Sequence, residues 1–168
     1  MKKTLFSLLI FVAMMGVTFT SLTACNSAPR ARAASPQAVS VEVAPALRPV
    51  LESALEQTRV TVGYDPAYVR ISYPGGAVPL KTGVCADVIV RAFRKGGVDL
   101  QKEVHEDMAR NFAAYPNRWG LNAPDTNIDH RRVANLMTYF KRRNKSLPIT
   151  ANAKDYLPGD IVAWDLGR

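Results

Sequence analysis

The clearest folding signal in this sequence is a helical pattern that begins at a cysteine and ends at a pair of glycines. Its apolar side chains recur at intervals of three and four residues over 85–95, which places them on one face of a helix. These residues are Cys85, Val88, Ile89, Ala92 and Phe93. Gly96 and Gly97 then stop the helix. A helix of this kind must bury its apolar face against other elements of the same chain.

Three further segments have helical periodicity. The first follows Pro49 and ends before Gly63, the second ends before Pro116, and the third has Asn127 or Asp129 available as its N-cap. Their repeating residues are Leu51, Ala54, Leu55 and Thr58; Val104, Met108 and Phe112; and Val133, Leu136, Met137 and Phe140.

Strand patterns are fewer. Residues 68–73 alternate bulky and polar side chains before the turn residues 74–76, which predicts a strand at the edge of a sheet. Residues 161–166 form an apolar strand pattern that needs neighbours on both sides. Helices first and a strand last in one short domain predict an α+β fold.

The N-terminal end is typical of an export signal. Two lysines precede an apolar run over residues 5–19, which is too short to span a membrane. The run ends in Leu22-Thr23-Ala24-Cys25, which resembles the lipobox of bacterial lipoproteins. We therefore expect a signal peptide over residues 1–24 and lipid attachment at Cys25. The alternative is an ordinary secretory signal that is cut near residues 31–33.

A tether is expected after the lipid. Residues 25–46 are rich in Ala, Pro and Ser and too poor in large side chains to form a core. Asn26 differs from the aspartate that retains enterobacterial lipoproteins in the inner membrane, so the outer membrane is favoured. We expect one domain over residues 47–168, anchored in the bacterial cell envelope and facing the periplasm.

The charge of the chain must be weighed against this location. Lys and Arg number 22 against 14 Asp and Glu, giving a formal net charge of +8, which makes nucleic acid an early candidate partner. Export separates the protein from chromosomal DNA, so we predict no nucleic-acid partner. A basic run without acidic residues suits an anionic polymer or membrane, or equally a solvated helix end. It comprises Arg131, Arg132, Lys141, Arg142, Arg143 and Lys145.

Cys85 is the strongest candidate for chemistry. If Cys25 carries lipid, Cys85 is the one remaining thiol, and no intramolecular disulfide is possible. At the start of a helix, free backbone N–H groups and the helix dipole stabilise a thiolate, as a nucleophile requires. The alternative is a small buried core residue, because free cysteines are often buried.

The two histidines are weaker candidates for catalysis than Cys85. His105 is flanked by three acidic residues and is predicted to be a solvated or salt-bridged surface residue. His130 is predicted to join a hydrogen-bond network at a helix start. No pair of ligand residues has the spacing of a familiar zinc site, so we predict no metal and no cofactor. The loop over residues 115–128 is a candidate wall of a site.

Several strings of the sequence resemble the bacterial family called domain of unknown function 1287. They are Gly83-Val84-Cys85-Ala86-Asp87-Val88-Ile89, Val104-His105-Glu106-Asp107-Met108, Asn111-Phe112, Tyr115-Pro116, Trp119-Gly120-Leu121, Pro124-Asp125-Thr126-Asn127-Ile128-Asp129-His130-Arg131 and Pro158-Gly159-Asp160-Ile161-Val162-Ala163-Trp164-Asp165-Leu166. More distantly, that family is similar to the NlpC-type, papain-like peptidases and amidases of the bacterial cell wall. The resemblance implies a nucleophilic cysteine at the start of a helix that packs on an antiparallel sheet.

By this resemblance Cys85 matches the nucleophile, and Pro158–Leu166 matches the strand that leads toward a catalytic histidine. The sequence stops at Gly167-Arg168, before that histidine, so the resemblance implies a papain-like domain that is incomplete at its C-terminus. Further residues of these strings are expected as neighbours of the site. They are Asp87, His105, Trp119, His130 and Asp165.

Two functions remain open from the sequence. The leading prediction is an envelope cysteine hydrolase that acts on amide bonds of cell-wall peptide, in a truncated form without the expected histidine. The alternative is a non-catalytic, lipid-anchored envelope binding protein or a degenerate homologue. The hydrolase predicts peptidoglycan or its peptide as the partner, and the binding protein predicts anionic wall or lipid, held by the region 115–132 and the basic run. Both predict membrane attachment through Cys25.

Overall fold

The structure is a computed structural model that describes residues 43–165 and Gly167. The predicted signal peptide, the lipid attachment at Cys25 and almost all of the tether lie outside the described residues, as does Leu166. The α-helices of the described part are α1 (Arg48–Val60), α2 (Cys85–Lys95), α3 (Leu100–Asn111) and α4 (Val133–Arg142). The strands are β1 (Gly63–Tyr64) and β2 (Thr82–Gly83), and 3₁₀ turns cover Pro45–Leu47, Phe112–Ala114, Asp129–Arg131 and Ala153–Asp155.

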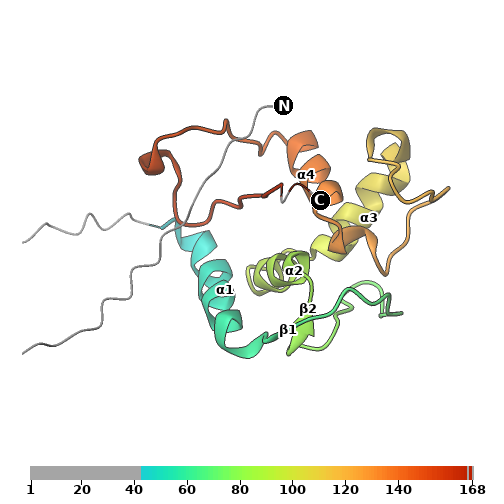
Figure 1. Cartoon of the computed structure of the whole chain (residues 1–168), viewed down its shortest axis with the longest axis horizontal. Helices are drawn as coiled ribbons and strands as arrows, with labels where there is room; N and C mark the ends of the chain where they lie inside the picture. Colours follow the sequence, from blue (N-terminus) through green and yellow to red (C-terminus); the bar gives the residue numbers. More distant parts are fainter. Residues whose placement is uncertain (1–42, 166, 168) are drawn as a thin grey trace, which may run out of the picture. The chain divides into compact units, whose positions relative to one another are not determined.

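The helices contact one another in chain order. α2 packs against both α1 and α3, and α4 packs against α3 (Figure 1). Their shared core consists of Ala86, Val90, Leu100, Val104, Met108, Tyr115, Leu136 and Tyr139. Leu100 and Val104 of α3 are completely buried, and burial of such side chains stabilises the fold by about 1.5–3 kcal/mol each. None of the helices in residues 43–165 is long and apolar enough to cross a membrane.

The predicted helices are confirmed, and α2 has the bounds that its periodicity indicates. In α1, however, the buried residues are Ser53 and Gln57, while Leu55 is 68% exposed. The Gln57 amide donates to the Val88 carbonyl of α2 at 3.1 Å. Because this hydrogen bond satisfies a buried amide group, α1 packs a polar face where an apolar one was expected.

The predicted caps of α4 are wrong. The N-cap is Arg132, and no side chain caps the helix. Asp129 lies in the preceding 3₁₀ turn and accepts the backbone N–H of Asp125, while the Asn127 side chain accepts the N–H of Ile71. Asp129 therefore binds the loop that precedes it, and Asn127 binds the segment over residues 68–73.

The sheet differs most from expectation. β1 and β2 pair in parallel, with Gly63 opposite Thr82 and Tyr64 opposite Gly83. The α+β class holds at this coarse level, with a very small sheet, but the described residues contain no antiparallel papain-like sheet. Residues 161–165 are exposed and irregular, since no strand lies beside them in the described part of the chain to complete a ladder.

The predicted strand over residues 68–73 is also irregular, and the reason is visible in its hydrogen bonds. Side chains take the backbone groups that a neighbouring strand would have taken. Asn127 accepts the N–H of Ile71 at 2.9 Å, and Gln101 donates to the Ser72 carbonyl at 2.9 Å. The segment is extended but anchored by side chains from distant elements.

Side chains also bind the backbone just before β2 and at its first residue. Arg91 of α2 is buried and donates to the carbonyl oxygens of Pro79 and Thr82 at 2.9 and 2.8 Å. Further back, the carboxylate of Asp99 accepts the N–H of Gly75 at 2.8 Å. The whole connection between β1 and β2 is thus fastened to α2 and α3.

Candidate functional site

The start of α2 presents the candidate nucleophile. Cys85 is the first residue of α2, and its side chain is exposed, so the alternative of a buried core cysteine is wrong. The residue before it, Val84, donates its N–H to Asp87 at 2.7 Å, and the Asp87 N–H donates back to the Val84 carbonyl at 2.9 Å. The first N–H groups of a helix have no acceptor within it, so the thiol stands beside donors.

Gly83 fixes the approach of the chain to this helix. Its φ is +146°, and a Cβ at this position would lie 2.6 Å from Oδ2 of Asp87. Its carbonyl accepts the N–H of Asp65 at 3.0 Å, just after β1. A side chain at position 83 would therefore displace the carboxylate that caps the Cys85 helix.

A buried ion pair holds that carboxylate. Arg131 donates from Nε to Oδ1 of Asp87 at 2.9 Å and from Nη2 to Oδ2 at 3.1 Å, and the two side chains are 2% and 6% exposed. The same guanidinium donates to the carbonyls of Ala67 at 2.9 Å and Asp65 at 3.3 Å. A carboxylate near a thiol opposes a thiolate, and this bidentate cation offsets its charge.

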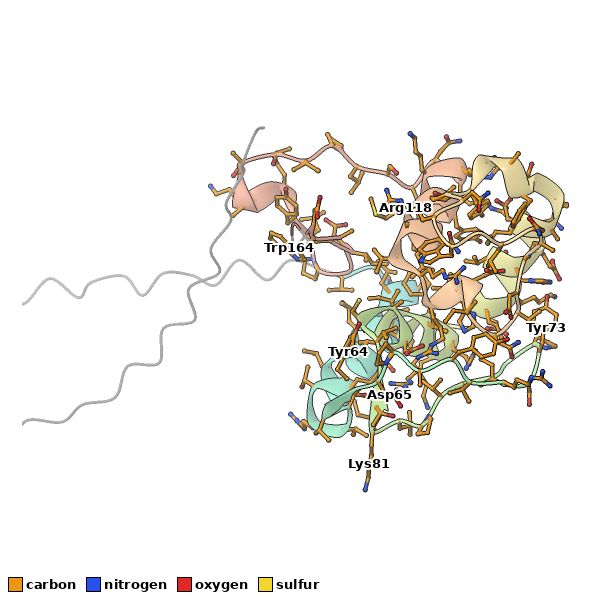
Figure 2. All side chains as sticks on the ribbon, turned by 45° about the vertical axis from the view of Figure 1, so that its right-hand side comes forward. Tyr64, Asp65, Tyr73, Lys81, Arg118 and Trp164 are labelled. Atoms are coloured by element: carbon orange, nitrogen blue, oxygen red, sulfur yellow. The ribbon has the colours of Figure 1, made fainter. Side chains whose placement is uncertain are left out.

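The extended segment that Arg131 contacts can be followed in Figure 2. Asp65 and Tyr73 are labelled near the two ends of this segment, and Lys81 extends away from the protein just before β2. Arg131 thus ties the 3₁₀ turn 129–131 and the beginning of this segment to the helix that carries Cys85.

His130 is buried within the 129–131 turn. Burial lowers the pKa of His130 to about 4, so the ring is neutral at neutral pH. Its Nδ1 has no hydrogen-bond partner, and the expected hydrogen-bond network is not formed at this atom. A neutral, desolvated imidazole is favourable for a base, but contact with the reacting group is required first.

His105 lies on α3 beside another carboxylate. Its Nδ1 is 3.9 Å from Oδ2 of Asp129, and its ring meets Tyr73 edge-on with 5.1 Å between centroids. Burial raises the pKa of Asp129, although Arg132 and the Asp125 amide act in the opposite direction. His105 is therefore a partly buried residue whose nearest carboxylate is Asp129, beside the 129–131 turn.

In the part of the chain that the structure describes, no hydrogen bond joins either histidine to Cys85, and Nδ1 of both rings has no hydrogen-bond partner. Among these same residues, no group of three His, Cys, Asp or Glu side chains is placed to hold a metal ion. The start of α2 therefore presents an exposed thiol beside backbone N–H donors.

The other predicted neighbours are dispersed. Trp119 is 41% exposed, and the Arg132 guanidinium lies 4.1 Å from the centre of its ring. Asp165 is exposed and accepts the N–H of Gly167 at 2.9 Å. Figure 2 labels Trp164, which lies on the same C-terminal segment as Asp165. Neither of these interactions of Trp119 and Asp165 involves Cys85.

The basic run is less available than the sequence suggests. Arg142 donates to Asp107 at 2.7 Å, and Arg143 lies 3.8 Å from Glu103. Both acidic residues lie on α3, outside the basic run, so the sequence of the run alone does not identify them as its partners. With Arg131 buried, these arginines fasten α4 and the 129–131 turn to the rest of the fold.

An open groove lies beside the same framework. It has a volume of about 720 Å³, and one side is formed by Tyr68, Arg70 and Ile71. The opposite side is the loop 121–127, part of the segment that sequence composition indicated as a site wall. The Tyr68 hydroxyl joins the sides by donating to Asp125 at 3.0 Å.

Sequence reasoning missed the residues that organise this region. Arg131 was grouped with surface cations and Tyr68 with a strand, and neither was connected to Cys85 or to the loop. The nearest available signal was the Asp125–Arg131 string, whose many side chains with hydrogen-bonding capacity are unusual for a simple connection. Asp87, the ion-pair partner of Arg131, is 44 residues away in the sequence.

Comparison with known proteins provides one family and one curated relative. Residues 51–168 match the family described as Domain of unknown function (DUF1287). The chain is 56% identical over 117 residues to "Uncharacterized protein YijF" of Escherichia coli (strain K12). That alignment covers 70% of this chain and 57% of the relative, so the chain spans little more than half of the relative's length. No solved structure matches.

Proposed function

This chain belongs to the family described as Domain of unknown function (DUF1287), and from that premise we propose that it serves as a cysteine hydrolase acting on amide bonds of cell-wall peptide. The observation that carries the proposal is the exposed thiol of Cys85 at the first position of α2. Helix N-termini are where nucleophilic cysteines gain stabilisation from N–H groups and the dipole.

In the proposed reaction, the base takes the proton of the Cys85 thiol as the sulfur attacks the carbonyl carbon of the substrate amide. The N–H groups at the start of α2 stabilise the negative charge that develops on the carbonyl oxygen. The tetrahedral intermediate then expels the amine, which takes a proton from the base, and leaves a thioester on Cys85. Water hydrolyses the thioester, releases the acid and restores the thiol.

The base is part of the proposal and is assigned by resemblance. His105 and His130 do not bond the thiol, so we assign this role to the histidine that the NlpC-type resemblance places beyond Pro158–Leu166. Asp87 and Arg131 act as positioning residues, because their hydrogen bonds hold the first turn of α2 and do not involve the Cys85 sulfur.

The proposed location is the periplasmic face of the cell envelope, with the outer membrane favoured. A lipid on Cys25 and the tether over residues 25–46 would let the domain reach nearby peptidoglycan. Mass spectrometry of the protein extracted from membranes tests this part separately. A free N-terminus beyond Cys25, or a chain that begins before it, would contradict the anchor.

The test of catalysis compares variants of the whole protein as the cell makes it. Cys85→Ala and Cys85→Ser are expected to reduce the release of soluble peptide from purified sacculi to background, measured by chromatography and mass spectrometry. Lys81→Ala is the matched control, because Lys81 lies close in sequence and extends away from the protein (Figure 2). Turnover that survives in both Cys85 variants would refute the hydrolase.

The alternative is a non-catalytic envelope binding protein. The specific observation in its favour is that neither histidine hydrogen-bonds Cys85 in the described residues, whereas a polar groove is present. Binding to sacculi without peptide release, and equal in the Cys85→Ala variant, is the expected result for this function. Charge reversal for this purpose belongs at Lys141 and Lys145, which are exposed, because Arg142 and Arg143 also hold α4 to α3.

A further inference from the structure

The groove beside Arg70 has the chemistry of an anion subsite. We propose that it binds a free carboxylate of the cell-wall peptide through the Arg70 guanidinium, with the peptide backbone lying along the loop 121–127. The identity of the peptide rests on the proposed function. The groove itself, its residues and its charge are properties of this structure alone.

Arg70 is the basic residue of this groove, and it has no acidic partner among the described residues. Its side chain is exposed and lines the groove, and within residues 43–165 it forms no ion pair. This sets it apart from Arg131 and Arg142, whose guanidinium groups are held by Asp87 and Asp107. An arginine presents a planar fork of donors that matches a carboxylate in a bidentate geometry.

The walls around Arg70 are held in place before any ligand binds. Asp125 accepts both the backbone N–H and the side-chain amide of Asn127, at 2.8 and 2.9 Å. The Tyr68 hydroxyl donates to the other carboxylate oxygen of Asp125 and accepts from Asn127 at 3.0 Å. Gln101 donates to the Thr126 carbonyl from below the loop at 3.0 Å. A ligand that enters the groove therefore does not have to order it.

The negative charge of Asp125 does not reverse the selectivity of the groove. Burial raises the pKa of Asp125, but the hydrogen bonds from Asn127 and Tyr68 outweigh it, so the pKa lies below its ordinary value and the group stays ionised. Both of its oxygens already accept hydrogen bonds from these donors, whereas Arg70 forms no ion pair among the described residues.

The remaining surface suits a peptide rather than a free small anion. Asn122 is exposed beside Leu121 and Pro124, so an amide group and an apolar patch follow one another along the loop. A peptide can place its carboxylate on Arg70, its amide groups on Asn122 and a short apolar side chain on Leu121. Inorganic anions and small carboxylates such as acetate lack the last two contacts.

The groove is also connected to the nucleophile. The residue before Tyr68, Ala67, accepts a hydrogen bond from Arg131, and Arg131 holds the carboxylate that caps the helix of Cys85. The groove wall and the first turn of α2 are thus fixed to the same guanidinium.

Calorimetric titration of the whole protein carrying Cys85→Ala tests the inference, because that variant does not consume the ligand. The probe is the cell-wall tetrapeptide L-Ala-γ-D-Glu-diaminopimelyl-D-Ala, with its carboxylates free or amidated. Arg70→Gln is expected to weaken binding of the free peptide by roughly tenfold or more, and amidation of the peptide should weaken it similarly. Arg59→Gln, an exposed arginine of α1 outside the groove, is the control and should have no effect.

Other results would overturn the inference. Equal affinity of Arg70→Gln and the control shows that the carboxylate is held elsewhere, and equal affinity for acetate shows that no peptide site exists. If the tetrapeptide does not bind, the inference fails while sacculus turnover by Cys85 is untouched. If Cys85 turnover fails but Arg70-dependent binding persists, the subsite stands in a binding protein. Circular dichroism of Arg70→Gln checks that the variant is folded.

Discussion

Removal of the Arg131 guanidinium is the sharpest test of how the candidate site is held. Arg131→Met keeps much of the side-chain volume but leaves Asp87 as a buried carboxylate without its cation. Breaking one partner of a buried ion pair costs about 3–5 kcal/mol, a large part of the free energy of unfolding of a small domain. With a urea dependence of about 1–1.5 kcal/mol per molar, the unfolding midpoint should fall by about 2–5 M.

The assay is urea unfolding followed by circular dichroism, with Lys102→Met as control. Lys102 lies 3.9 Å from Glu106 on the exposed face of α3, and such pairs contribute at most about 1 kcal/mol. If Arg131→Met does not fold, Arg131→Lys is the second variant, because it keeps a charge but loses the bidentate geometry. A midpoint for either Arg131 variant equal to that of Lys102→Met would refute the reasoning.

Three further predictions use the same unfolding measurement. Gly83→Ala should lower the free energy of unfolding by about 1–3 kcal/mol and slow alkylation of the nearby thiol, because the new Cβ meets the capping carboxylate; unchanged alkylation would contradict this. His130 has a folded pKa of about 4 against its ordinary 6.5, so the unfolded chain binds the proton first. The contribution of His130 to the free energy of unfolding should therefore be fully present above about pH 6.5 and fall by about 3 kcal/mol on acidification to about pH 4. His130→Gln should flatten this pH dependence, and His105→Gln should not. Tyr115→Phe removes a buried hydroxyl that donates to Asp107 at 2.6 Å and should cost about 1–2 kcal/mol, whereas an unchanged midpoint would show that this hydrogen bond is dispensable.

The helices were predictable because their signals are local. In α2, the apolar spacing and the two glycines that follow it contain all that is needed to set both ends. The position of Cys85 at the helix start follows from the same local pattern. Its exposure does not, because exposure depends on which other segments cover the first turn.

The rest depended on pairs that are far apart in sequence. The alternation over residues 68–73 is typical of a strand, yet Asn127 and Gln101 take its backbone groups, and nothing local signals that competition. Arg131 is an ordinary basic residue until the fold brings it to Asp87. Polar groups buried by long-range partners are the features that periodicity cannot locate.

The fastening of the connection between β1 and β2 has a consequence for proteolysis. This connection has almost no secondary structure, but its backbone is held at Ile71, at Gly75 and along residues 78–82 by side chains from α2, α3 and the loop 121–127. Proteases need an extended stretch of backbone that can leave the surface. Among the described residues, trypsin should therefore spare the bond after Arg70 and cut first after Lys145 and Lys154, in the exposed segment that follows α4.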